Sequence, residues 1–111
     1  MAKARTKADY LKDSEELEAK GLFVGAARNI RYNLEKHGTE DLTAPEIREL
    51  QGKVLLLFDR CLRKESEQSK LDDHVAISLE AANYAKSVGD SRTNTLFSGY
   101  YFFETVKKLE L

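Results

Sequence analysis

The spacing of the apolar residues is the feature that most constrains how this chain can fold. Apolar residues recur at intervals of three and four along nearly the whole sequence, and no stretch alternates strictly between apolar and polar residues. Intervals of three and four match the period of an α-helix, whereas strict alternation matches the period of a β-strand. The sequence therefore predicts an all-α fold.

Glycines and capping residues divide this pattern into about five helices. Gly21, Gly38 and Gly89 follow apolar stripes, where glycine is typical of a helix end. Thr43 and Glu46 have the spacing of a capping box. The expected helices cover residues 8–20, 22–36 and 44–64, then run from a cap at Asp72 or Asp73 to residue 88 and from a cap at Asp90 or Ser91 to residue 108. We expect residues 65–70 to be a polar connection, and the short connections predict antiparallel neighbours.

Length and cysteine content bear on domain organisation and compartment. A chain of 111 residues predicts one helical domain, at residues 8–111, after a flexible N-terminus at residues 1–7. The single cysteine, Cys61, leaves no possible internal disulfide. The N-terminus has no signal-peptide pattern, and the longest apolar run, residues 54–58, is too short to cross a bilayer. We therefore expect a cytoplasmic protein that does not enter a membrane.

The charges of the chain are nearly balanced. Lysine and arginine together number 18, aspartate and glutamate number 19, and the two signs are interspersed. A surface that follows a nucleic-acid backbone needs a basic excess, so this balance argues against a nucleic-acid partner. The small basic cluster of Lys3, Arg5 and Lys7 has the composition of a solvated terminus or, less often, of a nucleic-acid-binding arm.

A regular order of large and small residues occupies residues 10–30. Its members are Tyr10, Ser14, Leu17, Gly21, Phe23, Ala26 and Ile30. A small residue on each of two helices lets their axes approach, and the large residues interlock around that contact. This order resembles a tetratricopeptide repeat, although Asp13, Asn33 and Gly38 depart from that family's pattern. The resemblance implies a short solenoid of helical hairpins, but any antiparallel hairpin of two helices would produce part of this order, so the expected fold is a helical bundle or a short solenoid. Either interpretation implies protein binding without catalysis.

Side chains able to hold a metal or attack a substrate are few. His37, His74 and Cys61 have no pair at the close spacing of a zinc site, and the chain lacks a glycine-rich phosphate loop. Cys61 falls in the apolar register of the third expected helix, which favours a small core residue over a nucleophile. We therefore expect no metal and no cofactor.

One arrangement suggests an enzyme. Arg31 is followed after five residues by His37, near the end of the second expected helix. The pair resembles the arginine and histidine of HEPN ribonucleases, which implies an arginine that holds a phosphate and a histidine that transfers a proton. Six helical positions turn about 600 degrees, however, and so place the two residues on different faces. The alternative interpretation is a surface arginine and a loop histidine, so the sequence does not establish an enzyme.

The last expected helix contains four consecutive aromatic residues, Tyr100, Tyr101, Phe102 and Phe103. Four successive residues point in nearly every direction around a helix, so one small domain cannot bury them all from one side. We expect them to bind protein, either a second copy in a homodimer or another protein's helix or peptide. The alternative is that this helix lies in the middle of the bundle under the N-terminal helix. In that case Arg28, Arg31 and His37 become the surface candidates.

Overall fold

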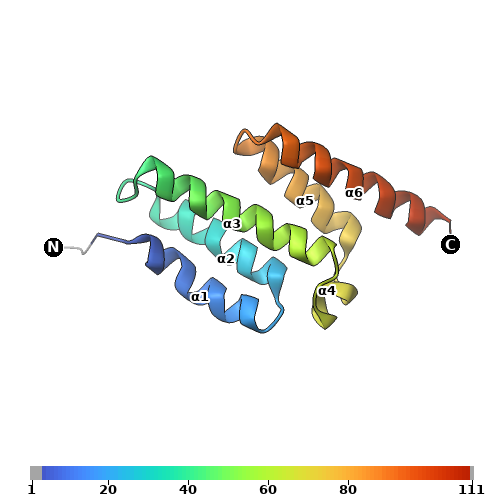
Figure 1. The fold of residues 1–111 in the computed structure, drawn as a ribbon, viewed down its shortest axis with the longest axis horizontal. Coiled ribbons are helices and arrows are strands. Elements are labelled where there is room, and N and C mark those ends of the chain that lie inside the picture. Colours follow the sequence, from blue (N-terminus) through green and yellow to red (C-terminus); the bar gives the residue numbers. More distant parts are fainter. Residues whose placement is uncertain (1–3, 111) are drawn as a thin grey trace.

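The computed structural model describes residues 4–110, and these residues form helices joined by short connections (Figure 1). The helices are α1 Lys7–Ala19, α2 Phe23–His37, α3 Ala44–Leu62, α4 Glu67–Leu71, α5 His74–Ser87 and α6 Ser91–Leu109. The prediction of an all-α fold is confirmed for this part of the chain. None of these helices is long and apolar enough to cross a membrane.

The prediction of about five helices missed α4, in a segment expected to be a polar connection. A reciprocal pair of serines starts this helix: Ser69 N–H donates to Ser66 Oγ, and Ser66 N–H donates to Ser69 Oγ. Ser69 is fully buried, so α4 turns a serine towards the core in place of an apolar stripe. Apolar periodicity could not reveal a helix of this kind.

The helices pack largely in chain order and form a slab. α2 packs on α1 and α3, α5 packs on α3, and α6 packs mainly on α5. The slab measures 57 × 29 × 18 Å, with α1 and α6 at opposite edges (Figure 1). The alternative in which the last helix lies in the middle of the bundle under the N-terminal helix is therefore wrong.

The capping box predicted at Thr43 is confirmed at the start of α3. Glu46 N–H donates to Thr43 Oγ1 across 3.3 Å, and Thr43 N–H donates to the Glu46 carboxylate across 2.9 Å. The second bond favours the charged carboxylate and lowers the pKa of Glu46. Pro45 lies in the first turn, where a missing N–H has no helical partner to lose.

The N-terminal segment predicted to be flexible, residues 1–7, falls partly outside the described residues. Lys3 lies outside them, as do the first two residues. Thr6 caps α1, which begins at Lys7, one residue before the expected start. Lys7 pairs with Glu49, and the Arg5 guanidinium lies 5.9 Å from the centre of the Tyr10 ring. The two described members of the basic cluster therefore contact this domain's own side chains.

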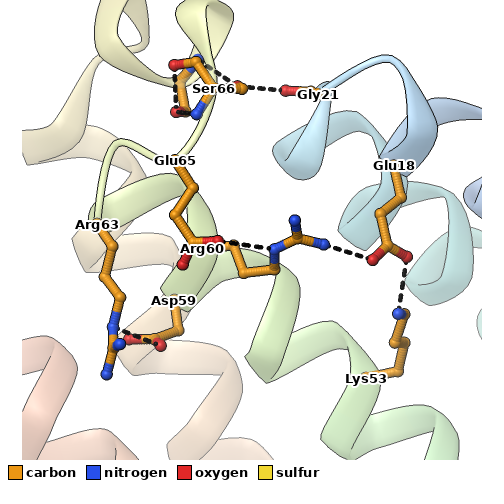
Figure 2. A network of polar contacts seen from close by, with 9 residues as sticks. Glu18, Gly21, Lys53, Asp59, Arg60, Arg63, Glu65 and Ser66 are labelled. Atoms are coloured by element: carbon orange, nitrogen blue, oxygen red, sulfur yellow. Dashed lines mark hydrogen bonds and ion pairs between the residues drawn. The ribbon is translucent and has the colours of Figure 1, made fainter.

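The turn between α1 and α2 requires glycine for two reasons. Gly21 has a φ of +76°, a conformation that side chains disfavour. A Cβ at this position would also lie 2.7 Å from the Cβ of Ser66. Ser66 approaches this closely because its hydroxyl donates to the Gly21 carbonyl across 2.7 Å (Figure 2). The start of α4 is thus held against the first hairpin.

A polar network links the same elements (Figure 2). Glu18 on α1 accepts from Lys53 and from Arg60 on α3, at 2.7 and 2.5 Å. Arg60 also pairs with Glu65 at 3.1 Å, and its guanidinium lies 4.3 Å from the centre of the Phe23 ring. Because one arginine contacts three elements, the network fixes α1, the start of α2 and the segment before α4 relative to α3.

We predict that Tyr10→Phe destabilises the protein by about 1 kcal/mol. Tyr10 is buried, and its hydroxyl donates to the Gly38 carbonyl across 2.6 Å, so the substitution leaves that carbonyl without its partner. Urea denaturation followed by circular dichroism measures the change. Tyr32→Phe is the matched control, because Tyr32 is 58% exposed. Equal stability of the two variants would contradict the prediction.

Candidate interaction surface

The inward face of α6 is fixed to the rest of the protein. Phe97 is fully buried, and the ring of Tyr100 lies beside it with centroids 6.5 Å apart. The Asn94 side chain donates to the Ala82 carbonyl on α5 across 2.8 Å. Glu104 pairs with Lys64, which follows α3, at 3.8 Å. These contacts set the rotation of α6 about its axis and so decide which side chains face solvent.

The outward side of α6 carries a group of exposed apolar residues. We call it the outer face of α6 and define it as Leu96, Gly99, Phe102, Phe103, Val106 and Leu109. The exposed fractions of its large side chains are 49% for Leu96, 71% for Phe102, 61% for Phe103, 38% for Val106 and 80% for Leu109. Among residues 4–110, the other exposed large apolar residues are Tyr32, Leu56, Leu71 and Leu79, which are distributed over four helices. Single exposed apolar residues are normal, whereas a contiguous group is typical of an interaction site.

The structure divides the four predicted aromatic contact residues into two pairs. Tyr100 and Tyr101 are half-buried, and Tyr100 packs against the core. Phe102 and Phe103 are largely exposed.

The sequence prediction missed Leu96, Val106 and Leu109. Their spacing from the two phenylalanines was the available signal, because Leu96 and Val106 lie seven and three residues from Phe103, and Leu109 lies seven from Phe102. Such intervals bring residues to one side of a helix.

The surface candidates Arg28 and Arg31 both contact Glu80 on α5. Arg28 binds the carboxylate through two nitrogens, at 2.6 and 3.1 Å, and Arg31 pairs with it at 3.3 Å. The Arg31 guanidinium also lies 4.6 Å from the centre of the Tyr84 ring. These contacts join α2 to α5, and Nε of Arg31 is buried there without a hydrogen-bond partner among the described residues.

His37 lies apart from these contacts, at the last residue of α2. Its side chain is exposed, and its pKa is lowered by partial desolvation and by the positive charges of Arg5 and Lys36. Arg31 is directed towards Glu80, and no contact joins it to His37 within residues 4–110. The ribonuclease hypothesis stays a prediction, and RNA cleavage assays with His37→Ala would decide it.

Cys61 lies on α3, in the hydrophobic core of the protein. It is fully buried, and its thiol donates to the Asp72 carboxylate across 3.4 Å. Burial, with a smaller contribution from Asp72, raises the pKa of the thiol to about 12. The thiol is therefore neutral near pH 7, which is unsuitable for a nucleophile. Within the described residues, no three His, Cys, Asp or Glu side chains come together in a group that could hold a metal ion.

We predict that a maleimide dye does not label Cys61 in native buffer at neutral pH and labels it once per chain after denaturation. The raised pKa, about 12 instead of 9, lowers the thiolate fraction about a thousandfold. Mass spectrometry counts the attached dye. Leu71→Cys is the positive control, since Leu71 is 80% exposed. Rapid native labelling of Cys61 would show that the core around α3 opens readily.

Comparison with known proteins found no match among protein-family models, curated proteins or solved structures, so a functional proposal must be based on the fold and its surfaces.

Proposed function

We propose that this protein is a noncatalytic interaction domain that self-associates through the outer face of α6. The observation that carries the proposal is the group of exposed apolar side chains on one side of a helix whose other side is packed against the core. A helix at the edge of a domain normally presents a polar side to water. This helix presents two phenylalanines there instead.

The energetics favour a protein partner. Burial of one exposed phenylalanine side chain stabilises an interface by about 1.5–3 kcal/mol. Aromatic side chains are enriched in the centre of protein interfaces, where they exclude water. Phe102 and Phe103 lie near the middle of the exposed apolar group along the helix, with Leu96 on one side and Leu109 on the other. This distribution is typical of an interface with an aromatic centre and a smaller aliphatic border.

A second copy of the chain is the partner that we propose. Most soluble oligomers are homo-oligomers, and two-fold dimers are the commonest of them. A helix is suited to this arrangement because its exposed stripe can pack against an identical stripe. The edge position of α6 leaves its outer face accessible to another molecule (Figure 1).

The proposal also includes the type of helical fold and the cellular location. The packing of helices largely in chain order supports a short solenoid similar to tetratricopeptide repeats, and so does the burial of Tyr10 and Ser14 on α1 and of Ala26 on α2. A cytoplasmic location is supported by the single cysteine, which removes any need for an oxidising compartment.

We predict that the wild type sediments as a dimer at micromolar concentration and that Phe102→Glu, Phe103→Glu sediments as a folded monomer. Two charges in the centre of an apolar interface remain unpaired on association, which prevents it. Both side chains are exposed in a single copy, so the helix content measured by circular dichroism should be unchanged.

The matched control is Tyr32→Glu, which also places a charge at an exposed aromatic position. Tyr32 lies on α2 and stacks with Lys36, so the control exchanges a cation–π contact for an ion pair one helical turn apart. The control should remain a dimer. A wild type that sediments as a monomer at micromolar concentration would refute self-association.

A further inference from the structure

We infer that two copies pair through α6 in an antiparallel register in which Gly99 of each copy receives Phe103 of the other and Arg92 pairs with Glu110. This inference rests on the proposed self-association and specifies how the partner is oriented. It follows from the spacing, the sizes and the charges of residues along one side of α6.

A line of six residues runs along the outward side of α6, from its first turn to its C-cap. Its members are Arg92, Leu96, Gly99, Phe103, Val106 and Glu110. All six are exposed. Intervals of four and three are those of the contact line between two packed helices. The successive intervals are four, three, four, three and four, so the line reads the same from either end.

This symmetry fits an antiparallel two-fold pair. A two-fold axis perpendicular to α6 near residue 101 brings each member opposite its counterpart from the other end. Leu96 then faces Val106, Gly99 faces Phe103, and Arg92 faces Glu110. Phe102 and Leu109 border the line on one side and extend the apolar contact.

The sizes of the facing residues are complementary. Glycine destabilises the interior of a helix relative to alanine. Gly99 is exposed, and a Cβ built on it would meet nothing within 4 Å in its own chain. No contact within the described structure therefore requires a glycine at this position. A partner's phenylalanine does require it, because the missing side chain provides the space for the ring of Phe103.

The charges at the two ends of the line support the same register. Arg92 and Glu110 form no ion pair within the part of the chain that the structure describes. Arg92 lies in the first turn of α6 and Glu110 is its C-cap, so each has the sign that the helix dipole disfavours at that end. In the antiparallel pair each charge meets an opposite charge and the favourable end of the partner's dipole. A parallel pair would bring like charges together.

Charge reversal tests the register. Arg92→Glu places two acidic side chains together at each end of the pair, and Glu110→Arg places two basic ones together. We expect each variant alone to dissociate about tenfold more readily than the wild type. An equimolar mixture of the two should recover wild-type affinity, because the mixed pair has opposite charges at both ends. Both substitutions suit the helix dipole, so neither should unfold α6.

Cysteine cross-linking measures the register directly. Leu96→Cys and Val106→Cys chains, mixed and oxidised, should form a disulfide between the two variants. The Leu96→Cys variant oxidised by itself should remain largely uncross-linked. In the antiparallel pair, position 96 of one copy lies about 15 Å along the helix axis from position 96 of the other, which is beyond the reach of a disulfide. Buried Cys61, with a pKa of about 12, does not compete. A parallel pair would give the opposite result.

Substitution of Gly99 tests the space for Phe103. Gly99→Leu should weaken the dimer at least about tenfold without lowering the melting temperature of the monomer, because a Cβ at this position meets no other part of the chain within 4 Å and leucine favours a helix more than glycine does. Gly52→Leu on α3 is the matched control, since a Cβ there also meets nothing within 4 Å. The control should leave the affinity unchanged.

The outcomes separate this inference from the proposed function. A wild-type dimer whose charge variants do not recover on mixing, or whose Leu96→Cys copies cross-link with each other, overturns the register and leaves self-association standing. A monomeric wild type overturns both. Recovery on mixing together with selective cross-linking between positions 96 and 106 establishes the antiparallel pair.

Discussion

The burial of α3 on more than one side is the constraint on which the rest of the structure depends. Leu50, Val54, Leu57, Phe58 and Cys61 of this helix are all fully buried. No single neighbour can cover so much of a helix, so α3 packs on α1 and α2 and also on α5. The polar network around Arg60 then fixes how the neighbouring segments are oriented relative to α3, because ion pairs require a more defined geometry than apolar contacts do (Figure 2). The position of α6 at the edge follows, since α5 lies between it and most of α3.

The sequence predicted those elements whose signals are local. The boundaries of α2 and α3 came close because Gly38 and the box of Thr43 and Glu46 act on the adjacent backbone. Within the apolar run at residues 54–58, Leu55 and Leu57 are buried, whereas Leu56 is half exposed. α4 was missed because its core contact is Ser69, a residue that apolar periodicity does not count.

The functional surfaces were harder to predict, because they depend on which side of a helix the rest of the chain covers. Four consecutive aromatic residues indicate that some must be exposed, but Phe97 and its neighbours on α5 decide which ones are. Arg31 and His37 illustrate the same limit. They are close in sequence, but Glu80 and Tyr84, about fifty residues further along the chain, determine where the Arg31 side chain points.

The edge position of α6 has a consequence for valency. Figure 1 places α1 at the edge opposite α6, so the dimer that we propose would have one α1 edge at each of its ends. A protein that binds the α1 edge would then find two copies of its site on one dimer. Two weak contacts then act together through effective concentration, and the strength of attachment comes to depend on how much of the protein is paired.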